Sequence, residues 1–163
     1  MKIALVQMVL GEIPGGNRVR AETLLEKSGL VDPALILFPE LFSTGFSKTF
    51  ASGKLPFSKE TLESEDRTFF SGLAKKYGSF VLGAGLGFGE GYGSFLNQSY
   101  WFDPAGKLLR TYRKIHPFSF SGEDEAFQSG SELSLCEFGG MNLCQTICYD
   151  LCFPELFRAG LDA

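Results

Sequence analysis

The amino-acid sequence predicts one α/β domain, in which helices pack against a β-sheet. An apolar run at residues 2–9, a helical pattern at 18–28 and a second apolar run at 34–38 follow one another. This strand, helix and strand order is the unit of layered α/β folds, and its crossover is right-handed by default. The length of 163 residues suits one domain and is too short for two substantial ones. Hydrophobic residues at 44% and charged residues at 21% are close to the averages of globular proteins.

Charge and cysteine content narrow the class of protein further. Lys and Arg number 15 against 19 Asp and Glu, and the resulting net charge of -4 gives no general attraction to nucleic acid or an anionic membrane. No apolar run approaches the roughly 18 residues of a membrane helix. Four cysteines are too few for a disulfide scaffold, and the N-terminus lacks a signal-peptide pattern. We therefore expect a cytoplasmic protein with reduced thiols.

Local patterns predict the N-terminal elements. The run KIALVQMV at 2–9 is aliphatic and ends at a Gly- and Pro-rich stretch, so we expect a buried first strand. Asn17 can cap a helix over 18–28, and Gly29 can end it. The apolar residues of this helix fall near helical spacing (Val19, Leu24, Leu25). The run ALILF at 34–38 predicts the second strand.

A long connection and a second helix follow. The segment 41–59 contains Ser-Thr-Gly and Ser-Gly breakers, and connections of this length are more often functional than decorative. A helical stretch near 65–77 can begin after Ser64 as its cap and end at Gly78.

The remaining chain predicts strands and one further helix. We expect strands at 79–86, 94–102, 108–114, 133–138 and 141–149. A Gly-rich tip joins the first two of these strands. An Asp-Pro-Ala-Gly turn then makes the third strand antiparallel to the second, and a Gly-Gly pair joins the last two. Pro154 suits the first turn of a helix.

The pentapeptide FPELF occurs twice, at 38–42 and 153–157. Each copy comes after an apolar strand, and its proline prevents further strand pairing. We therefore interpret both copies as marking carboxyl ends of strands, the edge where open α/β sheets bind ligands.

Cys148 is a candidate nucleophile, because it lies where a strand gives way to a turn before Pro154. Backbone NH groups at such a junction favour a thiolate and can hold an oxyanion. The alternative is a small buried hydrophobe, the usual role of a free cysteine. Four residues of strand span about 13 Å, which argues against a metal site or a redox pair built from Cys144 and Cys148.

A cysteine nucleophile needs a base, and two residues are candidates. His116 is the only histidine, and a Cys–His pair is conceivable. Glu40 follows the apolar segment ILFP, a setting that raises the pKa of a carboxyl group and suits proton transfer near neutral pH. Alternatively, Glu40 only complements the N-terminus of a short helix.

Lys114 ends the predicted strand LLRTYRK. Most lysines are solvated surface groups, but on the same rim as Glu40 and Cys148 this ammonium can stabilise a tetrahedral oxyanion. Glu123 and Glu125 follow in a polar loop, and either can be a solvated loop acid.

Three motifs in this order resemble the nitrilase, or carbon-nitrogen hydrolase, superfamily. They are PE at 39–40, YRKIH at 112–116, and ICYDL at 147–151 with FPE at 153–155. Each motif alone is weak, but together they extend the resemblance over essentially the whole chain. The resemblance implies an α-β-β-α sandwich with a Glu-Lys-Cys catalytic set, and it requires no metal or organic cofactor.

The resemblance also assigns roles to single residues. It implies that Cys148 is the nucleophile, that Glu40 is the general base and acid, and that Lys114 stabilises the oxyanion. The backbone NH of Tyr149 would be the second oxyanion donor. The accessory glutamate of the family matches Glu123, in the sequence Ser-Gly-Glu, better than the second acid of that loop.

The implied reaction is hydrolysis of a small amide to a carboxylic acid and ammonia through a thioester on Cys148. The stretch KIHPF with GEDEAF is most similar to small amidases of the omega-amidase kind, which cleave terminal amides of short carboxylic acids. An acyl- or carbamoyl-group hydrolase or transferase of the same fold uses the same thioester step and stays open. We expect a small-molecule amide as substrate, no nucleic-acid or membrane partner, and a homodimer by family analogy.

Domains of this family are longer than this chain. We therefore expect residues 1–163 to be the N-terminal part of a single carbon-nitrogen hydrolase domain, with the sandwich incomplete and apolar surface exposed. The alternative from another functional class is an inactive truncated fragment that serves only as a binding or assembly module.

Overall fold

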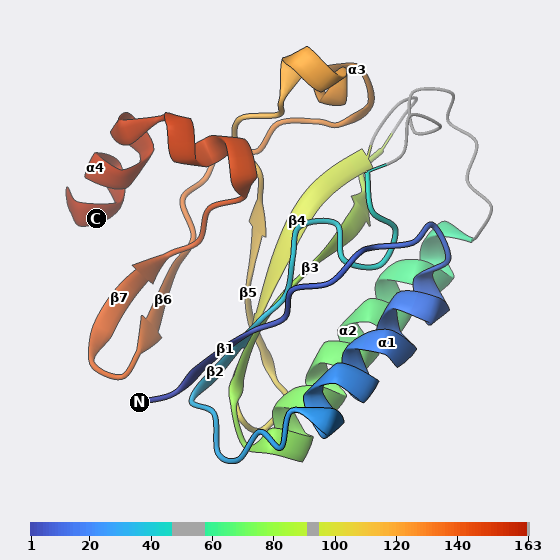
Figure 1. Ribbon diagram of the computed structural model, residues 1–163. Coiled ribbons are helices and arrows are strands. Elements are labelled where there is room, and N and C mark those ends of the chain that lie inside the picture. The colour runs from blue at the N-terminus through green and yellow to red at the C-terminus, as the bar shows by residue number, and fades with distance from the viewer. Residues whose placement is uncertain (47–57, 91–94, 163) are drawn as a thin grey trace.

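Seven strands form two sheets in the computed structural model, which describes residues 1–46, 58–90 and 95–162 (Figure 1). The larger sheet has the order β1-β2-β3-β4-β5, and the smaller is the pair β6-β7. The strands are β1 (Ile3–Leu5), β2 (Leu35–Leu37), β3 (Phe80–Phe88), β4 (Phe95–Phe102), β5 (Leu108–Arg113), β6 (Leu135–Phe138) and β7 (Met141–Cys144). The α-helices are α1 (Pro14–Lys27), α2 (Lys59–Tyr77), α3 (Glu123–Ala126) and α4 (Pro154–Asp162), and the 3-10 helices are η2 (Ser119–Ser121) and η3 (Cys148–Cys152).

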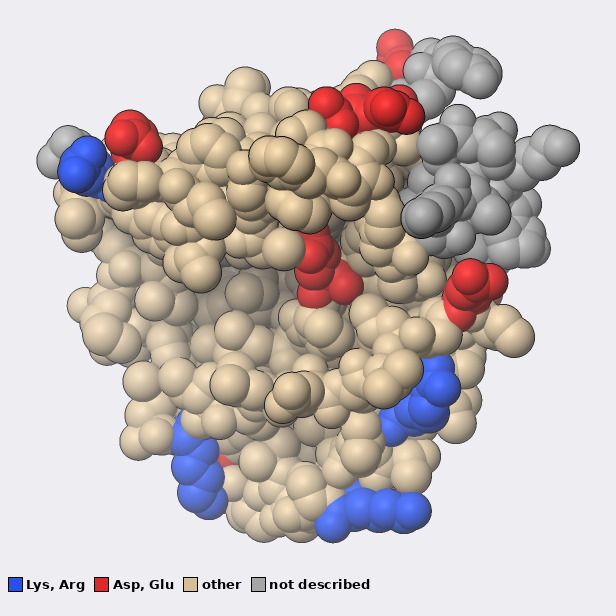
Figure 2. All heavy atoms as spheres, turned by 45° about the horizontal axis from the view of Figure 1, so that its top comes forward, with Lys and Arg blue, Asp and Glu red and all other residues tan. Residues whose placement is uncertain are grey.

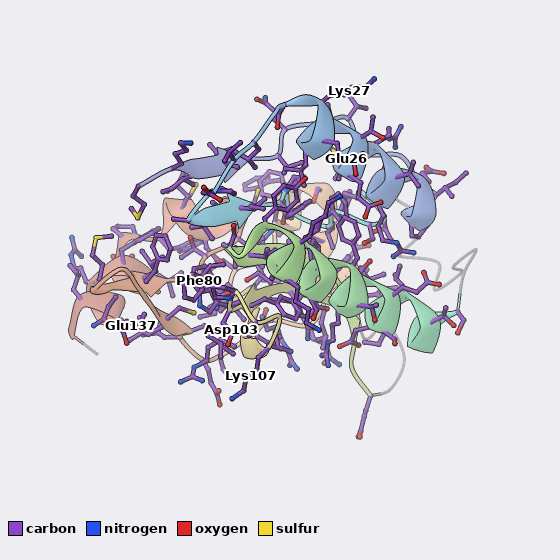
Figure 3. The ribbon with its side chains drawn as sticks, turned by 90° about the horizontal axis from the view of Figure 1, so that it is seen from below. Glu26, Lys27, Phe80, Asp103, Lys107 and Glu137 are labelled. Carbon is purple, nitrogen blue, oxygen red and sulfur yellow. The ribbon has the colours of Figure 1, made fainter. Side chains whose placement is uncertain are left out.

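The larger sheet is parallel on one side and antiparallel on the other. Strands β1, β2 and β3 run parallel, whereas β4 is antiparallel to both β3 and β5. The predicted α/β order is therefore confirmed. The turn between β4 and β5, where Lys107 N donates to the Asp103 carboxylate, lies at the end of the sheet away from α3 (Figures 1 and 3).

Helices α1 and α2 cover one face of this sheet (Figure 1). The core there combines buried side chains of both helices and of the central strands (Ala21, Leu25, Phe70, Leu73, Ile36, Val81, Tyr100). Phe70 packs so closely on β3 that a Cβ atom at Gly83 would lie 2.4 Å from its ring. Gly83 therefore allows α2 to approach the sheet.

The opposite face of the sheet is open at β1. Ile3 and Leu5 are 50% and 74% exposed, and with the β6-β7 hairpin they line an apolar hollow of about 600 Å³. The prediction of a buried first strand is therefore wrong. Strand β1 is an edge strand, and in the described part of the chain no element packs over these two side chains.

The start of α1 also differs from the prediction. The helix begins at Pro14, which suits the first helical position because its missing NH has no partner there. Asn17 therefore lies inside the helix and is not its cap. Its buried side chain instead donates to the carbonyls of Gly11, Phe42 and Ser43. The buried face of α1 contains Asn17, Ala21 and Leu25, whereas Val19 and Leu24 are exposed.

The second helix and the C-terminal region confirm some boundaries and correct others. Helix α2 ends at Gly78, whose positive φ of 58° suits glycine, but it begins with Ser58 as the cap rather than Ser64. Strand β7 ends at Cys144, so the strand predicted over 141–149 is too long. The second FPELF copy consequently opens α4 and does not follow a strand directly, whereas the first follows β2 as predicted.

Two surface properties concern possible partners. In residues 1–46, 58–90 and 95–162, none of the helices combines the length and apolar character needed to span a bilayer. Figure 2 shows one face formed mainly by uncharged residues, with Lys and Arg side chains scattered near its margins.

Candidate active site

Glu40 lies in the turn that follows β2. Pro39 ends the strand, and Leu41 takes a positive φ of 48°, which bends the chain sharply. Phe42 is fully buried, and its NH donates to the Ala84 carbonyl on β3 at 3.3 Å. The two residues after Glu40 therefore anchor the turn in the core, while the Glu40 side chain remains 30% exposed.

Lys114 follows β5, at the end of the sheet where α3 lies (Figure 1). Its NH donates to the Asn97 carbonyl at 2.9 Å, and its carbonyl accepts from Gly130 NH at 2.8 Å. The side chain is only 2% exposed, and its Nζ lies 2.7 Å from Glu40 Oε1 and 2.8 Å from Glu123 Oε2. A buried lysine requires such partners, so Lys114 is not the solvated surface group that most lysines are.

Glu123 is the first residue of α3 and is almost completely buried. Its Oε2 accepts from Lys114 Nζ at 2.8 Å and from Phe118 NH at 2.7 Å. Glu125, two residues further along the chain, is exposed. Of the two acids in this loop, the structure therefore brings Glu123 to Lys114.

Asn97 completes this group of charges, and the sequence analysis missed it. Its Nδ2 donates to Glu40 Oε1 at 2.7 Å and to Glu123 Oε1 at 2.8 Å. The side chain is 1% exposed. The available signal was a polar residue within the otherwise largely apolar strand FLNQSYWF, since a buried amide must find hydrogen-bond partners. We call Glu40, Asn97, Lys114 and Glu123 the charge cluster.

Cys148 opens η3 with a positive φ of 47° and is exposed. The turn is held by Asp150, whose fully buried carboxylate accepts from Ile147 NH at 2.9 Å and from Tyr112 OH at 2.8 Å. Tyr112 belongs to β5, two residues before Lys114. The Asp150 carboxylate thus ties the cysteine turn to the strand that carries the ammonium.

His116 is the second support of this turn. Its Nδ1 lies 2.9 Å from Asp150 Oδ1, and its ring stacks on Phe153 with centroids 3.6 Å apart. These contacts place its imidazole among the residues that hold Asp150, and they do not support the Cys–His alternative. The carboxylate alternative is supported instead, because Glu40 and Cys148 line the same cavity.

Residues 2–163 match the carbon-nitrogen hydrolase family. The chain belongs to this family. The resemblance predicted from three short motifs is therefore confirmed, together with the nitrilase-type α/β fold.

Several relatives within the family are named as amidases. The omega-amidase NIT2 of Danio rerio is 31% identical over 166 residues, which cover 95% of this chain and 57% of that protein. The 2-oxoglutaramate amidase of Bacillus subtilis (strain 168) is 30% identical over 149 residues, 89% of this chain and 54% of that protein. An amidase from Nesterenkonia sp. has a similar structure, with a TM-score of 0.79, 26% identity, and coverage of 98% of this chain and 59% of that one. The chain thus spans just over half the length of these relatives.

The Cys148 thiol is not activated at rest. Burial is the largest cause that raises its pKa, and the negative charge and hydrogen bond of Glu40 raise it further, while Lys114 opposes them. The expectation that backbone NH groups favour a resting thiolate is therefore wrong. The Glu40 carboxylate lines the same cavity as this thiol.

The Lys114 ammonium is stable in the same site. Burial alone would lower the pKa of this group, but the hydrogen bonds that Lys114 donates to Glu123 and Glu40, with the charges of these carboxylates, outweigh burial and raise the pKa above its usual value. Lys114 therefore stays charged at neutral pH.

A small cavity opens over these groups. Its volume is about 230 Å³, and it is lined by Glu40, Leu41, Phe46, Lys114, Phe118, Ser121, Glu123 and Cys148. The Tyr149 ring does not line this cavity and packs edge-on against Phe118, with centroids 4.9 Å apart. The role of the Tyr149 backbone NH stays a prediction. The cavity combines a thiol, a carboxylate and an ammonium around a largely apolar space, a combination suited to acyl transfer.

Proposed function

We propose that this chain carries the catalytic site of a hydrolase that cleaves the carbon-nitrogen bond of a small amide. Residues 1–163 would form the N-terminal part of a single carbon-nitrogen hydrolase domain. The observation that carries the proposal is the Lys114 ammonium held between Glu40 and Glu123 in the cavity that Cys148 lines.

The first step is attack on the amide carbonyl. Cys148 Sγ bonds to the carbonyl carbon as its proton passes to Glu40, and the carbonyl oxygen becomes an oxyanion. Two of the three Lys114 N–H bonds go to carboxylates within the described residues, which leaves one for that oxygen. The backbone NH of Tyr149 would be the second donor.

The second step releases ammonia and then the acid. Glu40 gives its proton to the amide nitrogen as the carbon-nitrogen bond breaks, and a thioester on Cys148 remains. Glu40 then takes a proton from water, the hydroxide attacks the thioester carbon, and Glu40 returns the proton to the Cys148 sulfur as the carbon-sulfur bond breaks. The products are a carboxylic acid and the free thiol. This sequence assigns each proton transfer to one carboxylate and uses neither a metal nor an organic cofactor.

Several observations support a small amide as the substrate. The cavity of about 230 Å³ suits a short acyl chain. A variant of the Nesterenkonia amidase has been crystallised in complex with acrylamide, and in another of its variants acrylamide has added to the active site cysteine. Because relatives in two kingdoms are an omega-amidase and a 2-oxoglutaramate amidase, we propose terminal amides of short carboxylic acids.

Location and assembly follow less directly from the site. The mechanism needs Cys148 as a thiol, which fits the reducing cytoplasm that we propose as its location. A homodimer stays a prediction from the family resemblance, and sedimentation analysis would test it.

Ammonia release from short mono- and diamides tests the proposed reaction. We expect release by the unmodified protein. We also expect it in the control variant Cys152→Ala, which removes the other exposed thiol of η3, the 3-10 helix that contains Cys148. We expect none from Cys148→Ala. Full activity in Cys148→Ala would contradict the thiol mechanism, and no release by the unmodified protein from any amide would favour the inactive-module alternative.

A further inference from the structure

Asn97 has no role in the proposed reaction steps, but it hydrogen-bonds the residues that carry them out. It lies in the middle of the sheet on β4, between the turn that carries Glu40 and the strand that carries Lys114. Its carbonyl accepts from Lys114 NH at 2.9 Å, and its Nδ2 donates to both Glu40 and Glu123. One residue therefore contacts every other member of the charge cluster.

The two carboxylates use these donors differently. Glu40 accepts from both Lys114 and Asn97 on the same oxygen, Oε1. Glu123 accepts from Asn97 on Oε1 and from Lys114 on Oε2. Two donors on one oxygen fix the rotation of the Glu40 carboxyl group, and among the described residues no hydrogen bond to its other oxygen, Oε2, competes with proton exchange.

The unpaired carbonyl of the Asn97 side chain is a second, independent observation. Its Oδ1 is buried and has no hydrogen-bond partner among the described residues. An unsatisfied buried acceptor is unfavourable, so an apolar residue of similar shape would serve the fold at least as well. The donors of Asn97 therefore serve the two carboxylates at a cost to the fold.

We propose that Asn97 is a positioning residue for the amide hydrolysis, which orients the Glu40 carboxylate so that Oε2 exchanges protons with Cys148 and the substrate. This inference rests on the proposed function. The Asn97 side chain donates to a carboxylate oxygen, so it holds Glu40 in the orientation in which the carboxylate can accept the thiol proton.

Two variants and one matched control test the proposal. Asn97→Leu keeps the approximate shape without donors, and Asn97→Ser is too short to reach both carboxylates. Ser99→Ala is the control, because Ser99 is buried, lies on the same face of β4, and donates to Gln145 Oε1 at 2.8 Å rather than to the charge cluster. Thermal melting of all three variants reports any general loss of stability.

The decisive measurement is the pH dependence of two reactions. The first is kcat/KM for ammonia release, and the second is alkylation of Cys148 by iodoacetamide, followed by peptide mass spectrometry. The second needs no turnover, and Cys152 is an internal reference in the same 3-10 helix. In both Asn97 variants we expect the acid limb of each profile to move to higher pH by about one unit, the equivalent of one charge-assisted hydrogen bond.

The expected kinetic signature is a fall of about tenfold in kcat with little change in KM, because Asn97 positions the base rather than the substrate. Ser99→Ala should keep the profiles of the unmodified protein. Unshifted profiles in both Asn97 variants, with Cys148→Ala inactive, would overturn this inference and leave the proposed function standing. Activity in Cys148→Ala would instead overturn the proposed function. If Asn97→Leu does not fold, the alkylation profile of Asn97→Ser decides.

Discussion

The two glutamates of the charge cluster share two donors, Lys114 and Asn97, but they differ in exposure and in how their oxygens are used. Glu40, on the turn after β2, is 30% exposed and uses one oxygen for both donors. Glu123, on α3, is 3% exposed and has both oxygens occupied. A carboxylate with a free oxygen beside a thiol can exchange protons, whereas a fully bonded, buried carboxylate is a fixed charge. We therefore propose that Glu40 transfers protons and that Glu123 only holds Lys114 in place.

Glu40→Gln removes the partly exposed carboxylate of the charge cluster, and we expect it to reduce activity more than any other variant discussed below. Glutamine keeps the size of the side chain but cannot accept the thiol proton, so kcat/KM should fall by about a thousandfold. Steady-state ammonia release measures this change. Glu125→Gln removes an exposed acid near α3 and should leave kcat/KM within about twofold. An equal loss in both variants would refute the special role of Glu40.

Lys114→Met removes the ammonium that pairs with both glutamates. The partly exposed Glu40 and the buried Glu123 would then face each other without the ammonium, and removing one partner of a buried ion pair such as Lys114–Glu123 costs about 3 kcal/mol or more. Urea unfolding should show this loss. In the unmodified protein the raised pKa of Lys114 means that its contribution to stability is present below pH 10.5 and is lost as the pH rises through the folded-state pKa. Stability independent of pH above 10.5 would contradict this assignment.

Glu123→Gln removes the charge of the buried carboxylate and leaves Glu40 unchanged. The shape and most hydrogen bonds remain, but the fixed negative charge disappears, so we expect kcat to fall by about tenfold, less than in Glu40→Gln. The hydrogen bond that Lys114 donates to Glu123 also raises the pKa of Lys114. The alkaline limb of the kcat/KM profile should therefore move to lower pH. If kcat fell as much in Glu123→Gln as in Glu40→Gln, the proposal that the two glutamates have different roles would be contradicted.

Asp66 sharpens the comparison, because it is a buried carboxylate outside the charge cluster. Burial raises its pKa to about 6, although hydrogen bonds from Ser43 and Arg18 and the Arg18 charge oppose this effect. The folded state therefore holds a proton more tightly than the unfolded state, and the free energy of unfolding should fall as pH rises from about 4 to 6. Chemical denaturation across this range, compared with Asp66→Asn, measures the effect. An unchanged slope in Asp66→Asn would assign the pH dependence to other groups.

The sequence predicted what local chemistry determines. Pro39 and Pro154 marked the end of one strand and the start of a helix, and the Gly-Gly pair after Phe138 marked a hairpin. Family motifs led to Glu40, Lys114, Glu123 and Cys148, which the structure brings together. These features depend on residues close in sequence or on a resemblance that includes them.

The missed features depend on contacts between distant segments. Asn97 joins the charge cluster only because β4 lies between β3 and β5, and the cysteine turn is held by Tyr112 and Asp150, 38 residues apart. The exposure of β1 depends on which element packs over it, and a run of apolar residues does not contain that information. Cross-strand register and layer packing thus set the limit of prediction.

Rapid-quench mass spectrometry of Cys148 is the most direct test of the thiol mechanism. After mixing with a short amide, we expect the Cys148 peptide to gain the mass of one acyl group, to lose it on treatment with hydroxylamine, and to accumulate little of it in Glu40→Gln. The Cys152 peptide should stay unmodified. Ammonia release without an acyl group on Cys148, or with the acyl group on another residue, would contradict the account.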